Sequence, residues 1–147
     1  MRTGHITAAP YFSSVESEEN SRSVAADRSR YGKGAPIGQY AASGYAALRL
    51  FAAALEVAGE MDTQRIAECA RGLEMEAPQR RIILDEDNNH TWLTSRVDEW
   101  NGVDGFDVVW TADQPIRPDA WLVGYGGVEG VSNLIYQTAD KTNGKET

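Results

Sequence analysis

The most regular pattern of apolar positions lies between Gln39 and Ala58. Apolar or small residues recur there at intervals of three and four, the spacing that places side chains on one face of an α-helix. We therefore predict a long helix over this range, packed into the core through this stripe and ended by Gly59. The stripe consists of Tyr40, Gly44, Ala47, Leu48, Phe51, Leu55 and Ala58.

A second, shorter helix is predicted directly after the first. Asp62 or Thr63 can cap its amino terminus, because a short side chain with an oxygen accepts hydrogen bonds from free backbone amides there. Arg71 falls in the last turn and Gly72 stands just past the end. The two helices are predicted to form a hairpin. The apolar face of the shorter helix consists of Ile66, Ala67 and Ala70.

Residues 16–30 are charged and rich in serine, which favours an exposed helix over a core one. Gly32, Gly34 and Pro36 then interrupt the helical pattern. A face of mixed charge is usually just solvated, and a surface for docking a partner is the alternative.

From Arg80 onward the pattern becomes that of strands. Residues 82–84 are a short apolar run, and residues 92–99 alternate with the period of two that a strand requires. Residues 101–105 are rich in residues that tolerate positive φ, and residues 106–111 form another strand-like segment. We predict an antiparallel strand hairpin here.

Both ends of the chain contain further extended segments. Residues 5–12 alternate until Pro10, which lacks a backbone donor and interrupts a strand ladder. Residues 121–125 are a candidate last strand. Residues 1–127 are therefore interpreted as one α/β domain, and residues 128–147 as a polar tail, partly disordered.

The composition narrows the possible functions. The 147 residues carry a formal net charge of −8, and such a surface repels nucleic acid and anionic lipid. The single cysteine cannot form an internal disulfide, and the two distant histidines do not suggest a metal cluster. No basic region with an apolar stretch opens the chain, and no membrane-spanning run is predicted. We expect a cytoplasmic protein, or a periplasmic one if a signal peptide lies upstream.

Three groups of residues suggest chemistry but have simpler explanations. Asn88-Asn89-His90 could be a metal or acid–base site, yet such residues between strands more often make turns. Cys69 lies inside the second predicted helix without a glycine elbow or a nearby base, which favours a structural role. Ser13-Ser14 lacks the Gly-x-Ser-x-Gly frame of a nucleophilic serine. We predict no enzyme activity, no metal and no cofactor.

Aromatic residues offer two candidate surfaces for a ligand. Tyr11 and Phe12 follow a predicted strand, where α/β proteins place ligands, and the alternative is burial against the long helix. The four tryptophans could form a platform, but they are scattered in sequence, which favours packing in a core or an interface. They are Trp92, Trp100, Trp110 and Trp121.

Five short motifs follow one another along the chain: Ala9-Pro10-Tyr11-Phe12-Ser13-Ser14, Ala77-Pro78-Gln79, Asn88-Asn89-His90, Thr94-Ser95-Arg96 and Pro115-Ile116-Arg117-Pro118-Asp119. Together they resemble the type I solute-binding proteins. The resembling branch contains the cytoplasmic aliphatic amide receptors that regulate amidase expression and the related short-chain amide and urea transport receptors. The resemblance covers roughly residues 4–123.

The resemblance implies an α/β chain with a partial type I periplasmic-binding-protein-like fold, in which a long helix hairpin precedes an antiparallel strand hairpin. It also implies the carboxyl-terminal portion of a longer, two-lobed receptor, with most of the ligand pocket upstream of Met1. Within this chain, Tyr11 and Thr7 are the candidate ligand-binding residues. The implied partners are a small aliphatic amide or urea, and either a transcription antiterminator or a transporter permease.

The chain departs from the resembling family in two places. Arg80 stands where the family has a glycine after Ala77-Pro78-Gln79, which questions the tight turn there, and Ser23 replaces an aromatic anchor. A receptor fragment is our leading interpretation. The alternative is a stand-alone structural or interaction domain that forms a homodimer and binds no small ligand.

Overall fold

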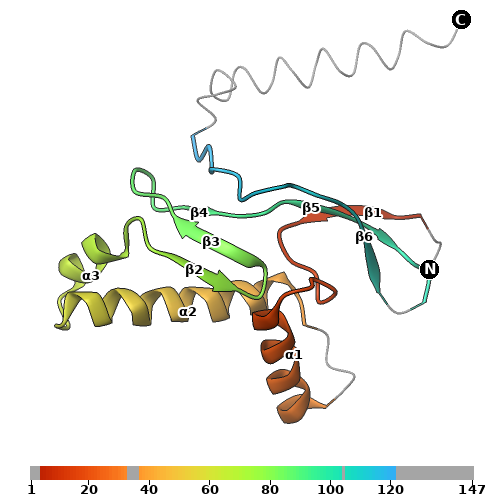
Figure 1. Cartoon of the computed structure of the whole chain (residues 1–147), viewed down its shortest axis with the longest axis horizontal. Coiled ribbons are helices and arrows are strands. Elements are labelled where there is room, and N and C mark those ends of the chain that lie inside the picture. Colours follow the sequence, from red (N-terminus) through yellow and green to blue (C-terminus); the bar gives the residue numbers. More distant parts are fainter. Residues whose placement is uncertain (1–3, 33–36, 104, 122–147) are drawn as a thin grey trace, which may run out of the picture. The chain divides into compact units, whose positions relative to one another are not determined.

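A computed structural model describes residues 4–32, 37–103 and 105–121 of the chain. The described part is an α/β structure, as predicted, in which one strand is followed by three helices and then by five strands (Figure 1). In chain order they are β1 (Ile6–Ala9), α1 (Glu18–Tyr31), α2 (Gln39–Ala58), α3 (Thr63–Ala70), β2 (Glu74–Ala77), β3 (Arg80–Leu84), β4 (Thr91–Trp92), β5 (Arg96–Trp100) and β6 (Phe106–Thr111).

The strands form two three-stranded antiparallel sheets, in the orders β1-β5-β6 and β2-β3-β4. The predicted hairpin between β5 and β6 is confirmed, with Trp100 paired to Phe106 across the turn. β1 is also confirmed: it ends at Ala9, directly before Pro10. β2 was not predicted, because its Glu and Ala residues have low strand propensity.

The prediction of one strand over residues 92–99 is wrong. Trp92 pairs with Ile83 in one sheet, whereas Arg96 pairs with Ala9 and Thr111 in the other. Between them, Leu93 forms an isolated bridge with Ile116. The chain thus changes sheets within four residues, and an alternating pattern cannot show this because it does not specify which strand is the neighbour.

The β2–β3 turn forms despite the missing glycine. Ala77 pairs with Arg80 across a turn made by Pro78 and Gln79. Arg80 adopts φ 78°, in the left-handed region that favours glycine. The doubt about this turn was therefore misplaced, and the backbone strain falls on Arg80.

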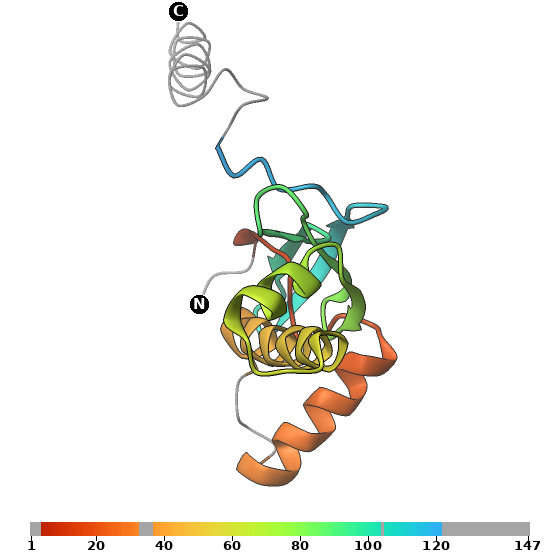
Figure 2. The same cartoon turned by 90° about the vertical axis from the view of Figure 1, so that its left-hand side faces the viewer.

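The long helix α2 has the predicted bounds, but the face that packs is a different one. Ala42, Ala46 and Ala54 are buried, whereas Leu48 is 72% exposed and Tyr40 90% exposed. The small alanine side chains let the helix backbone approach the β2–β3 hairpin closely, and larger side chains on that side would prevent it. In Figure 2, which looks nearly along α2, the strands lie on one side of the helix.

The two flanking helices begin at side-chain caps. Asp62 accepts a hydrogen bond from the Arg65 amide at 2.8 Å and starts α3, which packs against α2 as the predicted hairpin. Ser17 caps α1 by accepting from the Asn20 amide at 3.0 Å. α1 is mostly exposed, as predicted, but its Glu19 and Asn20 are buried.

The described core consists of two small clusters of buried residues. One joins the segment after β1 to α2, through Tyr11, Val15 and Ala42. The other joins α2 to the β2–β3 hairpin, through Ala46, Ala77 and Ile82, with Leu50, Met75 and Leu93 packed around it.

Several predictions fall on residues that the structure does not describe. The helix-breaking segment at Gly34 and Pro36, the candidate strand beyond Trp121 and the polar tail at 128–147 all lie outside the described residues. Trp121 itself lies in a turn and is 75% exposed.

Candidate functional site

The loop between β3 and β4 is a turn closed by Asp85. Its carboxylate accepts hydrogen bonds from the backbone amides of Asp87 at 3.0 Å and Asn88 at 3.2 Å. Asn89 adopts φ 58° and donates its amide to the Asp85 carbonyl. The interpretation of Asn88-Asn89-His90 as a turn is confirmed. Among the described residues, no group of three or more His, Cys, Asp or Glu could hold a metal ion.

Asp85 also fixes the Pro-Ile-Arg-Pro segment. The Arg117 Nε donates to Asp85 Oδ2 at 2.8 Å, the Trp92 indole donates to the same oxygen at 2.7 Å, and Arg117 also pairs with Asp87. Hydrogen bonds from Arg117, and then from Trp92 and the two amides, hold the pKa of Asp85 well below its usual range although it is buried. The cluster is structural, since every group in it is occupied in holding the loop.

Arg96 joins three backbone segments. The guanidinium is 2% exposed and donates to the carbonyls of Thr94 at 3.0 Å, Gln79 at 3.1 Å and Pro10. These carbonyls belong to the link between the sheets, the β2–β3 turn and the end of β1. The Thr94-Ser95-Arg96 motif therefore positions the segments around the crossing between the sheets, and burial lowers the pKa of Arg96.

Asp98 is the unusual polar residue of the β1-β5-β6 sheet. Its side chain is fully buried, and neither carboxylate oxygen has a hydrogen-bond partner among the described residues. Burial raises the pKa of Asp98, with Arg96 opposing the effect. Its direct strand partners are Thr7 on β1 and Val108 on β6, and such partners share a sheet face. A buried acceptor thus lies beside the half-buried Thr7.

A pocket of about 330 Å³ opens over the same sheet face. Val108, which lines it, is the strand partner of Asp98, and the lining residue Arg96 is two positions along β5, on the same face. Thr111 and Phe106 complete this wall, and Arg80 lies on the other side. The pocket combines two arginines, two carboxylates and two hydroxyl groups with one aromatic ring, and neither Asp98 nor Thr7 is among its lining residues.

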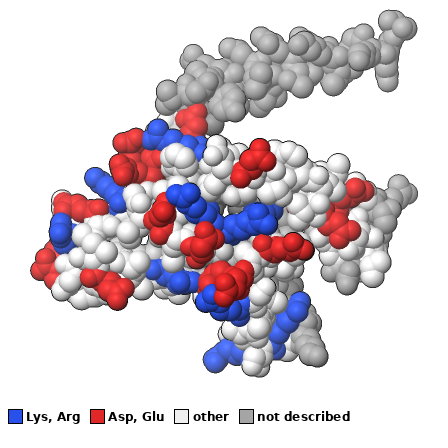
Figure 3. Space-filling model, in the orientation of Figure 1, with Lys and Arg blue, Asp and Glu red and all other residues white. Residues whose placement is uncertain are grey.

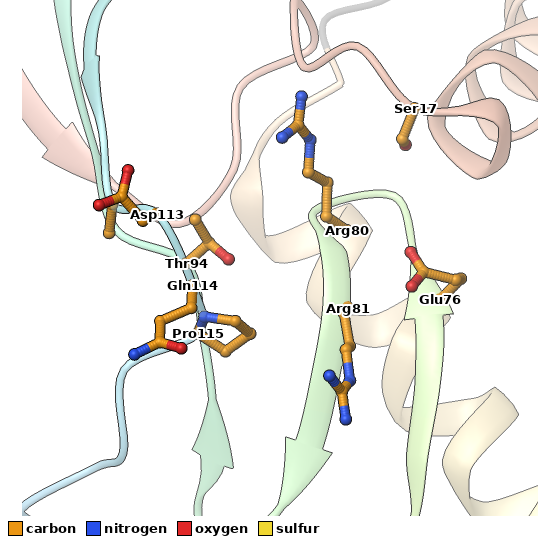
Figure 4. Close-up of a pocket in the computed structure, with 9 residues that line it drawn as sticks. Ser17, Glu76, Arg80, Arg81, Thr94, Asp113, Gln114 and Pro115 are labelled. Atoms are coloured by element: carbon orange, nitrogen blue, oxygen red, sulfur yellow. The ribbon is translucent and has the colours of Figure 1, made fainter.

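A neighbouring pocket of about 440 Å³ shares Arg80, and most of the residues that line it are of polar type (Figure 4). One wall carries Thr94, Asp113 and Gln114, and the other carries Arg80 and Arg81 from β3. Arg81 is paired with Glu74, whereas Arg80 donates to the Glu16 carbonyl at 3.3 Å. Figure 3 shows acidic and basic side chains interspersed over the face in view, without a large area of one sign.

Tyr11 does not lie on a pocket wall. Its ring is 3% exposed, its hydroxyl donates to Asn20 Oδ1 at 2.8 Å, and burial raises its pKa. Phe12 packs against Phe106, with 5.7 Å between the ring centroids. Tyr11 is therefore buried against the long helix α2, where it packs with Ala42.

The other residues singled out in the sequence have structural surroundings. Cys69 is a half-buried free thiol on α3, and the Ser14 hydroxyl donates to the Phe106 carbonyl at 3.3 Å. Trp100 packs edge-on against Phe106 with 5.2 Å between centroids, whereas Trp110 is 52% exposed. The described residues therefore show no tryptophan platform.

A third cavity, of about 470 Å³, is an apolar groove between α2, α3 and the strands β3 and β4. Leu50 and Phe51 line it from α2, Ile66 from α3 and Leu93 from the opposite side. The buried Gln79 side chain lies at its margin, and Gln79 Oε1 has no hydrogen-bond partner among the described residues.

Sequence reasoning missed Arg80, Arg96 and Asp98 as residues of a candidate site. Arg96 was part of a motif, but its three carbonyl acceptors are far apart in sequence. Asp98 shares its strand face with Thr94 and Arg96, and such a polar face is normally exposed, so the sequence pattern carried no signal for a buried carboxyl.

Residues 1–139 match the family described as the periplasmic binding protein domain, and the chain belongs to this family. The partial type I periplasmic-binding-protein-like fold expected from the sequence is therefore confirmed.

Solved structures of solute-binding proteins share this fold. A solute binding protein of an ABC transporter from Rhodopseudomonas palustris BisB5, in complex with 3,4-dihydroxybenzoic acid, is 22% identical with a TM-score of 0.70, over 78% of this chain and 32% of that chain. An R. palustris solute binding protein in complex with benzoate is 18% identical with a TM-score of 0.70, over 80% and 32% of the two chains. A leucine binding protein from Thermotoga maritima is 22% identical with a TM-score of 0.64, over 79% and 31%.

A sequence relative carries a different name. A limonene hydroxylase from Geobacillus stearothermophilus is 27% identical over 113 residues, which are 77% of this chain and 21% of that protein. The chain thus spans about a third of the solved relatives and about a fifth of this one.

Proposed function

We propose that this chain is the carboxyl-terminal portion of a non-enzymatic receptor for a small amide or urea, and that it contributes the Thr7 and Asp98 side of the ligand site. The observation that carries the proposal is the fully buried Asp98 carboxyl, which has no partner among the described residues and lies beside Thr7. A primary amide or urea has N–H groups that such acceptors bind, and carbonyl oxygens that Thr7 or Arg80 can donate to.

A neutral ligand fits the electrostatics better than a charged one. Pocket walls at Arg80 also carry Glu16 and Asp107, so neither sign of charge dominates there. A buried acid without a partner is less costly when it is protonated, and a neutral carboxyl both donates to and accepts from an amide. Tyr11 acts indirectly in this proposal. Its hydroxyl donates to Asn20, whose amide nitrogen donates to the carbonyls of Ser13 and Val15, in the segment that lines the pocket.

The transport and regulatory roles belong to the same proposal. Solved relatives are named as components of ABC transporters, which supports delivery of the ligand to a membrane permease. Control of a transcription antiterminator is the corresponding role in the amide-receptor branch, with a cytoplasmic location, whereas transport implies a periplasmic one.

Isothermal calorimetry on the purified chain tests this function. Acetamide, propionamide and urea are titrated at concentrations sufficient for millimolar dissociation constants. Benzoate and leucine are the comparison ligands, since one relative is in complex with benzoate and another is named a leucine binding protein. We expect saturable heat from one of the amides. Saturable heat from benzoate or leucine alone, or from none of the five compounds, would contradict the proposal.

Two variants locate the site. Thr7→Val removes a hydroxyl at nearly constant volume, and the loss of one hydrogen bond should weaken amide binding by roughly 2- to 10-fold. Thr63→Val is the matched control, because Thr63 is exposed at the start of α3, away from β1. Equal affinities for Thr7→Val and the unchanged chain would remove Thr7 from the site.

A second candidate function is an interaction domain that associates with its own copies and binds no small ligand. One observation favours it: several of the larger apolar side chains of α2, including Leu48 and Phe51, are exposed. Concentration-dependent association without any amide binding would support this candidate over the receptor.

A further inference from the structure

The apolar stripe of α2 lies mostly outside the face that packs, with Leu55 and Ala58 half-buried. Ala42, Ala46 and Ala54 are buried, whereas Leu48 is 72% exposed and Phe51 49% exposed. Successive helix positions turn by about 100°, so Leu48 points roughly 160° away from Ala46. α2 is also long and apolar enough to cross a membrane by length and composition, yet only 17% of it is buried among the described residues. An exposed apolar surface of this kind marks an interaction site.

The spacing along the stripe is that of a seam between two helices. Gly44, Leu48, Phe51, Leu55 and Ala58 are separated by steps of four, three, four and three residues, which is the repeat of 3.5 that keeps one seam facing a partner helix. No charged side chain interrupts the seam: the two charged residues of α2, Arg49 and Glu56, lie to one side of it.

The order of sizes along the seam is the same in both directions: small, large, large, large, small. We propose that α2 pairs in antiparallel orientation with the α2 helix of a second copy of this chain, about a two-fold axis at Phe51. Phe51 then meets Phe51 of the other copy, Leu48 meets Leu55, and Gly44 meets Ala58. The Phe51 contact lies on the axis and occurs once, whereas the other two contacts each occur twice, as two-fold symmetry requires. The small residues at both ends let the helix backbones approach.

The pair is weak. Helix α2 is about 30 Å long, and one helix pair of this length buries less than the roughly 1,600 Å² of a stable interface. Each copy also carries a net charge of −8, so two copies repel at low salt. Because the seam is uncharged, added salt screens the repulsion without weakening the contact, and the association strengthens with ionic strength.

The proposal goes beyond the receptor function and is independent of it: no α2 residue lines either of the two pockets that share Arg80, although Phe51 also lines the apolar groove beside α3. The proposal names the surface through which the second candidate function, the interaction domain, would associate with its own copies. Amide binding, whether by a monomer or by a dimer, neither supports nor contradicts this pairing.

The first test is sedimentation equilibrium on the full chain, from about 10 μM to about 1 mM, at low and moderate salt. We expect a monomer–dimer equilibrium that Leu48→Glu and Phe51→Glu abolish. Val57→Glu is the matched control: Val57 is 62% exposed on the same helix but outside the seam, and its variant should dimerise like the unchanged chain. A monomer throughout the range, or equal loss in the control, would overturn the proposal. Circular dichroism verifies that each variant is folded.

The second test fixes the orientation by disulfide formation in a Cys69→Ser background. Phe51→Cys should cross-link with itself, whereas Gly44→Cys should cross-link only when mixed with Ala58→Cys. The Gly44 substitution is tolerated, since a Cβ there meets no atom within 4 Å. Self-cross-linking of Gly44→Cys would show a parallel pair and overturn the geometry. Sedimentation of the chain with phosphatidylcholine vesicles, lost in Leu48→Glu, would assign the seam to a membrane instead.

Discussion

Arg80→Gly should stabilise the protein relative to Arg80→Ala, because the backbone at this position is in the left-handed region. Arg80 has φ 78°, directly after the Pro78-Gln79 turn. An L-residue with a Cβ pays about 1–2 kcal/mol in this conformation, which glycine avoids. Glycine also lowers the free energy of unfolding by roughly 0.5–1 kcal/mol, because it has greater conformational freedom in the unfolded chain. The net expected difference between the two variants is therefore about 1 kcal/mol in favour of glycine.

The comparison with alanine cancels the effect of losing the arginine side chain. Both variants lose the hydrogen bond from Arg80 Nη2 to the Glu16 carbonyl, so the difference between them reports the backbone alone. Urea unfolding followed by tryptophan fluorescence gives the free energy of unfolding of each variant. A glycine variant equal to or less stable than the alanine variant would refute the reasoning about strain.

Three further predictions follow from single residues. Asp98→Asn should raise the stability of the protein at neutral pH and reduce the pH dependence of that stability. The pKa of Asp98 is raised in the folded state, so the folded protein keeps the carboxyl proton to a higher pH than the unfolded chain does. Stability is therefore lost as the pH rises from the ordinary Asp pKa through the raised pKa of the folded state. Urea midpoints from pH 3 to 8 check this, and a midpoint lowered at all pH values would contradict it. Ser17→Ala should cost about 1 kcal/mol by removing the α1 cap, and an unchanged urea midpoint would count against that assignment. Ile82→Ala should cost about 2–5 kcal/mol, because Ile82 is 1% exposed between α2 and β2, and a loss below 1 kcal/mol would show a loosely packed core.

The helices could be predicted from sequence more completely than the way they pack. The bounds of α2 and the cap of α3 follow from local spacing and capping chemistry, and both were predicted. The buried face of α2 was not, because the helix has two apolar faces and the one with the larger side chains was chosen. The face that packs is made of alanines, whose advantage is close approach and not buried area.

The strands show the same limit. The β5–β6 hairpin was predicted from its turn, which is local, whereas the change of sheets between Trp92 and Arg96 depends on partners far away in sequence. The candidate site was predicted least well. Thr7 lies beside Asp98, but Asp98 becomes notable only when the structure shows its carboxyl buried without a partner among the described residues.

The measurement that tests the receptor proposal most directly is a residue-resolved NMR titration of the ¹⁵N-labelled chain with propionamide. The account predicts saturable amide shifts that are largest at Thr7, Arg96 and Asp98, with α3 unaffected. Shifts confined to α3, or none at any of these positions while the spectrum shows a folded protein, would contradict it.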